Sequence, residues 1–118
     1  MARFFLSHKE RISSQSHFDY VYNNDSTVRF PFGVLCYALK QGEDRHVAFV
    51  ASKRVGNSVQ RSVATRRFKE LFRLNQHRIN KRYDLIFKAN QSLLTMPVTQ
   101  CEALFVAALQ EVGLWLDI

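Results

Sequence analysis

The sequence is poor in the residues that mark several common protein classes. It contains two cysteines, two prolines and four glycines in 118 residues. Cys36 and Cys101 lie far apart, each in an apolar run, and match no metal-ligand spacing, so we expect two buried free thiols. No tract is rich in proline or glycine and no repeat occurs, which favours one domain over several joined by linkers.

Long hydrophobic runs are missing as well. No stretch approaches the length that a helix needs to cross a bilayer, and the apolar patch at 4–6 is too short for a signal peptide. The sequence therefore predicts a cytoplasmic protein without a membrane partner. Because 47% of the residues are hydrophobic, the chain can bury a core, and disorder is not expected for most of its length.

Acidic residues are few, and the positive charge is concentrated in one part of the chain. Ten Asp and Glu stand against 17 Lys and Arg, which gives a net charge of +7. Ten of the basic residues fall between positions 53 and 82, where Glu70 is the one acid. Such clustering is typical of a small domain that binds a polyanion, because it concentrates the field that attracts phosphates. A cationic surface without a particular partner is the alternative.

No set of side chains predicts catalysis or metal binding by the chain itself. No Ser-His-Asp set, carboxylate pair or glycine-rich phosphate loop can be named. The histidines show no ligand spacing with one another or with a cysteine: His8, His17, His46 and His77. We therefore expect no catalytic residue in the chain, and the sequence places no protein metal ligand.

The apolar periodicity predicts one domain with the element order α-β-β-α-β-α. An irregular basic arm over the first twelve residues precedes a short helix over 16–23, with Ser14 or Ser16 as its cap. The helix over 59–75 is the longest that the pattern predicts.

Two strands are predicted over 28–39 and 46–52, joined by a hairpin turn at 41–44. Pro31 and Gly33 disturb the first strand, which suggests an edge or a bulge there. The second strand is apolar throughout rather than alternating, so we expect it to be central and covered on both faces.

The second half of the chain follows a βαβ pattern. Asn57 or Ser58 can cap the helix over 59–75, and a strand over 84–89 follows it. A final helix is predicted over 98–112. A strand, helix and strand in succession make a βαβ unit, so the sheet is expected to be mixed.

The helix over 59–75 separates apolar from basic positions. Most of its cations share the side opposite the apolar residues, while Arg67 falls among the apolar positions without an explanation from the sequence. Basic side chains and backbone N–H groups at a helix start bind phosphates, and arginine adds bidentate geometry. A solvated helix face is the alternative. The candidate RNA-binding residues are Lys53, Arg54, Asn57, Arg61, Arg66, Lys69 and Arg73.

The segment 52–61, Ser-Lys-Arg-Val-Gly-Asn-Ser-Val-Gln-Arg, resembles the signature of the bacterial ribonuclease P protein family. Two more segments resemble family motifs, His-Phe-Asp-Tyr-Val-Tyr at 17–22 and Arg-Tyr-Asp-Leu-Ile-Phe at 82–87. One departure stands out: the family's Arg-Asn-Arg appears here as Arg61-Ser62-Val63, and its following lysine as Thr65. The resemblance spans nearly the whole chain.

The resemblance implies a single α+β domain over residues 1–118, with a mixed four-stranded sheet of the ribosomal-protein-like fold packed by helices. It implies a ribonuclease P subunit that binds the catalytic RNA and the 5′ leader of precursor tRNA, and so assists endonucleolytic 5′ maturation of tRNA. In the family the RNA subunit carries the active site and binds most of the Mg²⁺. The protein is then an accessory subunit, and no obligate protein partner is implied.

In this family a cleft between the first helix and the sheet holds the single-stranded leader. The matching positions are Phe18 and Tyr22, with Val34 and Cys36 on the adjoining strand. Bases stack on exposed rings, at roughly 1–3 kcal/mol per base. Core packing is the alternative, because aromatic residues at helical spacing usually belong to a core.

Three other functions stay open. A structural RNA-binding protein of the ribosomal type would use the same sheet and basic helix. A nuclease that acts by its own side chains is the second alternative. Ser62, Val63 and Thr65 motivate the third, a diverged homologue without the activity.

Overall fold

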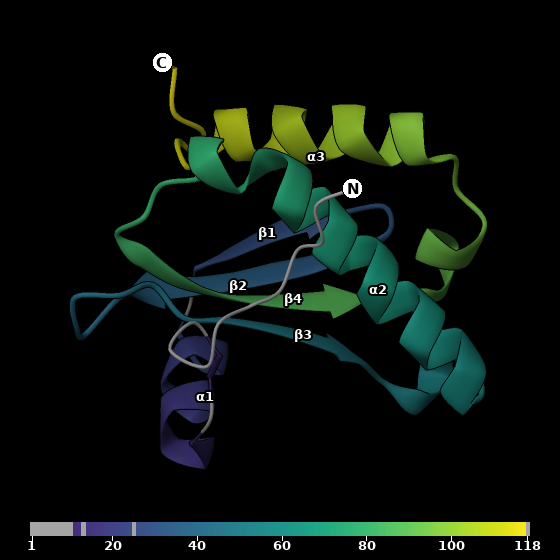
Figure 1. Ribbon diagram of the computed structural model, residues 1–118, viewed down its shortest axis with the longest axis horizontal. Helices are drawn as coiled ribbons and strands as arrows, with labels where there is room; N and C mark the ends of the chain where they lie inside the picture. Colours follow the sequence, from purple (N-terminus) through teal and green to yellow (C-terminus); the bar gives the residue numbers. More distant parts are fainter. Residues whose placement is uncertain (1–10, 13, 25, 118) are drawn as a thin grey trace, which may run out of the picture.

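A mixed sheet separates one short helix from two longer ones in the computed structural model, which describes residues 11–12, 14–24 and 26–117. Figure 1 shows α1 on one face of the sheet and α2 and α3 on the other. Most of the predicted basic arm, including His8, lies outside the described residues. No helix in the described part is long and apolar enough to cross a membrane.

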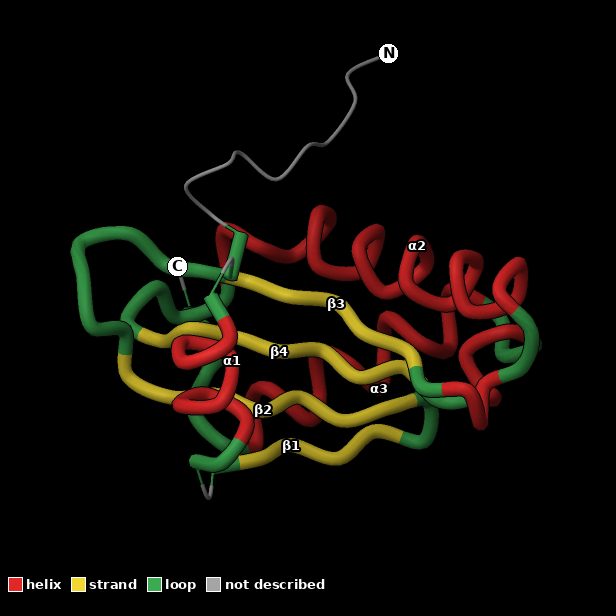
Figure 2. Tube along the Cα trace, turned by 90° about the horizontal axis from the view of Figure 1, so that it is seen from below, coloured by secondary structure: helices red, strands yellow, loops and turns green. Residues whose placement is uncertain are grey.

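The sheet has four strands in the order β1-β2-β4-β3, which Figure 2 shows from the side of α1. Their bounds are β1 Thr27–Phe30, β2 Gly33–Leu39, β3 Val47–Ala51 and β4 Tyr83–Ala89. Strands β1, β2 and β4 pair antiparallel, and β3 pairs parallel to β4. The α+β class and the mixed four-stranded sheet are therefore as expected.

The segment predicted as one strand over 28–39 is two strands. Phe30 pairs with Gly33, so Pro31 and Phe32 form a two-residue turn between β1 and β2. Proline cannot donate to a strand ladder and its fixed φ suits a turn, which explains the break. The observed element order is consequently α-β-β-β-α-β-α.

The prediction that β3 is central was wrong, as was the hairpin between β2 and β3. Strand β4 lies between them, and β3 is at the edge of the sheet. Its apolar run reflects coverage on both faces: Ala48 and Val50 pack on the side of α1, and Phe49 and Ala51 on the side of α2. Coverage on both faces therefore did not require a central position.

The helices form close to where the sequence predicts them: α1 Gln15–Tyr22, α2 Ser58–Asn75 and α3 Val98–Glu111. The Ser14 hydroxyl caps α1 by accepting from the His17 N–H at 3.1 Å. Asn57 caps α2, which connects the parallel strands β3 and β4. The predicted βαβ unit is thus confirmed.

The main core lies between the sheet and the helices α2 and α3. Six buried phenylalanine rings contact one another there: Phe30, Phe32, Phe68, Phe72, Phe87 and Phe105. A smaller cluster on the side of α1 contains Val21, Cys36, Ala38 and Ile86. Both cysteines are buried and free, as predicted, and desolvation by burial raises the pKa of each thiol.

Gly33, the first residue of β2, lies in close contact with the backbone of β4 and with a side chain of α2. A Cβ at this position would run into the carbonyl oxygen of Lys88 and lie 2.8 Å from Cε2 of Phe68. We expect Gly33→Ala to lower the free energy of unfolding by about 1–3 kcal/mol, because buried backbone and a packed ring must shift.

Urea denaturation measures this loss, with Gly42→Ala as the control. A Cβ added at Gly42 would have no atom within 4 Å, so this substitution should change stability by less than about 0.5 kcal/mol. Equal stability of the two variants would contradict the close packing of β2 against β4 and α2.

Candidate nucleic-acid interface

Helix α2 presents three of its cations, Arg66, Lys69 and Arg73, on the side that faces away from the sheet. The residues that it buries are Ala64, Phe68, Leu71, Phe72 and Asn75. At 3.6 residues per turn, Arg66, Lys69 and Arg73 lie within about 60° of one another, beside and opposite these positions, whereas Arg61 falls among the buried positions at the first turn of the helix. Arg66 and Lys69 are exposed, and Arg61 and Arg73 are half-exposed. The structure therefore brings Arg66, Lys69 and Arg73 onto one accessible surface and leaves Arg61 partly accessible at the start of the helix.

Lys53 and Arg54 extend this surface towards the end of β3. Both are exposed in a short 3₁₀ helix, η2 Lys53–Val55, which joins β3 to α2. We call the set Lys53, Arg54, Arg61, Arg66, Lys69 and Arg73 the basic face. Its position next to the first turn of α2 adds the positive end of the helix dipole to the side-chain charge.

Asn57 holds the start of α2 in place. Its Oδ1 accepts from the Gln60 N–H at 2.9 Å, and Gln60 Oε1 accepts from the Asn57 N–H at 2.9 Å. This capping box satisfies two backbone donors at once. Gly56 makes room for it, since its φ is +148° and a Cβ there would clash with the Gln60 side chain. The structure thus gives Asn57 a capping role, and its contact with RNA stays a prediction.

Arg73 is the one member of the basic face that is paired with a carboxylate among the residues that the structure describes. Its Nε donates to Glu70 Oε1 at 2.9 Å, and its Nη2 contacts the same oxygen. The hydrogen bond lowers the pKa of Glu70 and raises that of Arg73, so both stay charged. Within the same described ranges, the other five cations of the basic face form no ion pair, and their charge is available to a ligand.

Arg67 has a structural role that the sequence did not reveal. Its Nη1 donates to the backbone carbonyls of Leu93 at 3.2 Å and Leu94 at 3.0 Å. These carbonyls lie at the end of the 3₁₀ helix η4, Gln91–Leu94. A cation near the last carbonyls of a helical turn satisfies orphan acceptors, which explains an arginine among apolar positions.

A second surface lies on the opposite side of the sheet, where α1 packs. The structure brings the four predicted leader-binding residues together there, since Phe18 and Val34 pack against the cluster that contains Cys36. The rings of Phe18 and Tyr22 are stacked, with centroids 5.6 Å apart. Tyr22 is 40% exposed, whereas Cys36 is 5% exposed and lies beneath the surface.

Lys88 joins this surface, although it was not among the residues predicted from the sequence. Its Nζ donates to the Tyr22 hydroxyl at 2.8 Å and lies 4.8 Å from the centre of the Tyr22 ring. Alternation along β4 places Lys88 on the same side as the buried Ile86, which was the available signal. We call Phe18, Tyr22, Val34 and Lys88 the aromatic face.

The two faces meet at one end of the sheet. Val50 of β3 pairs with Lys88 of β4, and Lys53 follows Val50 by three residues. Three extended residues span roughly 10 Å, so the basic and aromatic faces are neighbours at the carboxyl ends of these strands.

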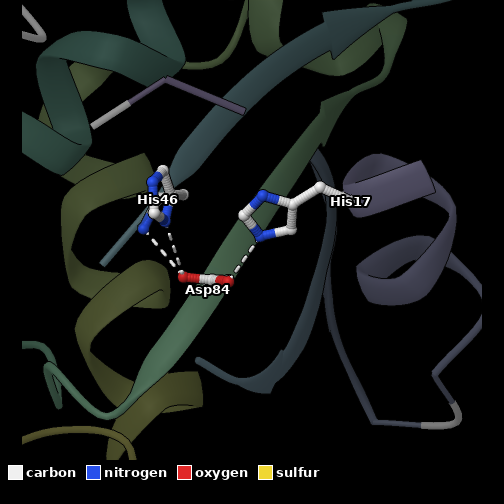
Figure 3. A group of neighbouring side chains, drawn as sticks. All are labelled: His17, His46 and Asp84. Atoms are coloured by element: carbon white, nitrogen blue, oxygen red, sulfur yellow. Dashed lines mark hydrogen bonds and ion pairs between the residues drawn. The ribbon is translucent and has the colours of Figure 1, made fainter. Parts of the chain in front are cut away.

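A third group combines three residues that the sequence did not connect. Figure 3 shows His17 of α1 and His46, next to β3, on either side of Asp84 in β4. His17 Nε2 lies 2.6 Å from Asp84 Oδ2, and His46 Nδ1 lies 3.6 Å from Oδ1. The group was missed because histidine spacing along the chain says nothing about residues that tertiary pairing brings together.

Comparison with known proteins points to one family. A family model described as Ribonuclease P matches residues 6–113. The ribonuclease P protein component of Clostridium novyi is 31% identical over 113 residues, which cover 93% of this chain and 99% of that protein. The corresponding protein of Alkaliphilus oremlandii is 32% identical over 82 residues, or 69% of this chain and 72% of that protein.

Solved structures show the same fold. An RNase P protein of Staphylococcus aureus superposes with a TM-score of 0.74 at 22% identity, covering 90% of this chain and 97% of its own. The RNase P protein of Thermotoga maritima gives a TM-score of 0.73 at 16% identity, with 86% and 96% covered. Three helices around a four-stranded mixed sheet are thus an established arrangement.

Arg66 and Arg67 are neighbours in α2, but Arg67 is bonded within the fold, while Arg66 is exposed at the surface. We expect Arg67→Gln to lower the free energy of unfolding by about 1–3 kcal/mol, because the carbonyls of Leu93 and Leu94 lose a charged donor. Arg66→Gln removes the same charge from an exposed position and should change stability by less than about 0.5 kcal/mol. Urea denaturation compares them, and equal losses would refute the assigned role of Arg67.

Proposed function

The chain belongs to the ribonuclease P protein family, and from this premise we propose that its basic face binds the RNA subunit of ribonuclease P while its aromatic face binds the 5′ leader of precursor tRNA. Membership makes the chain a subunit of a nuclease that acts in tRNA processing. The observation that carries the proposal is the accessible row of cations on and beside α2, five of which have no carboxylate partner within the described residues.

Binding of the RNA subunit would depend on charge. Each lysine or arginine that neutralises a phosphate releases condensed counterions, which favours association at low salt. Arg61 and Arg66 can also engage phosphate oxygens through two parallel hydrogen bonds. By lowering the repulsion between the RNA subunit and precursor tRNA, the protein would assist a reaction whose active site belongs to the RNA.

Mg²⁺ belongs mainly to the RNA in this proposal. The ion prefers oxygen ligands, whereas the basic face offers guanidinium and ammonium groups that repel a divalent cation. Glu70, the one carboxylate near these cations on α2, is engaged by Arg73. The residues of the basic face therefore suit phosphate rather than Mg²⁺, and the ion's contribution, charge stabilisation at the reacting phosphate, would be made on the RNA subunit.

The leader would bind by stacking and by charge together. Tyr22 offers an exposed ring, and Lys88 beside it offers a cation for the backbone phosphate. Proteins that bind single strands without reading their sequence combine these two features. Because mature tRNA lacks the leader, contacts on the aromatic face would favour the precursor. Such a role would place the protein in the cytoplasm, together with precursor tRNA.

Removing two cations of the basic face tests the contact with the RNA subunit. We expect the double variant Arg61→Gln, Arg66→Gln to bind the RNA subunit more weakly and to lower the salt slope of log K by about 1.4–1.8, since each phosphate contact contributes about 0.7–0.9. Fluorescence anisotropy at several salt concentrations measures both quantities.

Arg67→Gln is the matched control for the RNA titration, because it removes one charge that the fold uses internally. Its salt slope should equal that of the unaltered protein under conditions where it stays folded. A double variant with an unchanged slope would place the RNA subunit on another surface.

A substitution at Tyr22 tests whether the aromatic face binds the leader in the assembled holoenzyme. We expect Tyr22→Ala to reduce the preference for precursor over mature tRNA by about 1–3 kcal/mol, because one base loses its stacking partner. Tyr20→Ala is the control: Tyr20 is 37% exposed on the same helix, and its hydroxyl donates to the Leu39 carbonyl instead. Equal binding losses for precursor and mature tRNA would count against leader binding here.

A further inference from the structure

We propose that His17, His46 and Asp84 form a site for a divalent transition-metal ion, with Zn²⁺ as the best match. The three side chains come from α1, the residue before β3, and β4, and they converge at one point between helix and sheet. This site is separate from the proposed RNA contacts and goes beyond the function proposed above.

The distances between the candidate ligand atoms suit a small ion. One nitrogen from each ring and one carboxylate oxygen all lie within 4.8 Å of one another. Ligands at 2.0–2.2 Å around a tetrahedral ion are about 3.3–3.6 Å apart. His46 Nδ1 lies 3.6 Å from Asp84 Oδ1, which agrees with this spacing, and His17 Nε2 lies closer, 2.6 Å from Oδ2. Shifts below about 1 Å at these side chains would therefore complete the site.

The charge and burial of Asp84 favour a cation at this point. Its side chain is 1% exposed, and one oxygen is fixed by the backbone N–H of His46 at 2.8 Å. A buried carboxylate is costly unless it is paired or coordinates a metal. Two neutral imidazoles leave this charge only partly compensated, since they offer hydrogen bonds but no positive charge. A divalent cation would compensate it fully.

The ligand set decides between possible ions. Two imidazole nitrogens with one carboxylate oxygen are typical of zinc sites that keep a fourth position open, whereas Mg²⁺ and Ca²⁺ prefer oxygen ligands throughout. The side chains of His17 and His46 are 20% and 28% exposed, so an ion can enter and a water can complete its coordination. A nitrogen that binds the ion must carry no hydrogen. In a neutral His17 the hydrogen between Nε2 and Asp84 would move to Nδ1, and in a charged His17 it would leave as a proton.

Metal binding would anchor α1 on the sheet. In the described part of the chain α1 buries one side chain fully, Val21, so few apolar contacts hold it. His17 precedes Phe18 in the chain, and a bond from His17 through the ion to Asp84 would fix the aromatic face relative to β4. The ion would thus act as a structural link rather than as a catalyst.

Titration of Zn²⁺ into the full-length, metal-free protein by calorimetry tests the site without any RNA. We expect one ion per chain and a melting temperature that rises with the Zn²⁺ concentration. His17→Gln and His46→Gln should each weaken the affinity by more than about 100-fold, because loss of an outer-shell partner alone costs 10–100-fold. Asp84 is left intact, since its buried carboxylate also supports the fold.

His77→Gln is the matched control, because His77 is exposed on the short helix η3 (Gln76–Arg78) and lies outside the group. Its affinity for Zn²⁺ should equal that of the unaltered protein. Co²⁺ provides a second probe, since a tetrahedral site gives visible absorption that His46→Gln should abolish. Absence of saturable binding, or equal affinity in all three histidine variants, would overturn the proposal.

Discussion

The parallel pairing of β3 with β4 determines where everything else in this protein lies. Parallel neighbours cannot be joined by a tight turn, so the chain must cross from the end of β3 back to the start of β4 over one face of the sheet. Helix α2 makes most of that crossing. Its buried side closes the phenylalanine core, which leaves its opposite side, with the cations, towards solvent. The same pairing sets Lys88 beside Val50 and so joins the aromatic face to the basic one.

Neighbouring residues in α2 serve opposite purposes, because the helix turns by about 100° per residue. Arg66 points to solvent, while Arg67 reaches the carbonyls of η4 and ties the helix to the segment before α3. Composition counts both as positive charge available to a polyanion, but one of them is used within the fold. The positive charge that α2 has available for a ligand is therefore smaller than the sequence suggests, and the pair between Arg73 and Glu70 reduces it further.

Features encoded in neighbouring residues could be predicted from the sequence, and features created by tertiary contacts could not. The capping residues Ser14 and Asn57 sit one residue before their helices, and the apolar periodicity located each helix within one or two residues. Strand order had no such signal: an edge strand covered on both faces is as apolar as a central one, so β3 was misplaced. The partners of Arg67 and the histidines beside Asp84 are 26 to 67 residues away, beyond any periodicity.

The departure from the family signature at 62–65 has a consequence for the distribution of charge. Val63 and Thr65 stand where the resembled signature has an arginine and a lysine, and the Thr65 hydroxyl bonds to the carbonyls of Arg61 and Ser62 within the helix. The unpaired positive charge consequently gathers towards the start of α2, at Lys53, Arg54 and Arg61, close to Lys88 of the aromatic face. In the proposed function, an electrostatic field concentrated at this junction would act on both RNAs at once, because the start of the helix lies next to the end of the sheet. Lys53 and Arg54, which precede α2, thus keep positive charge beside the aromatic face, although Val63 and Thr65 add none along the helix.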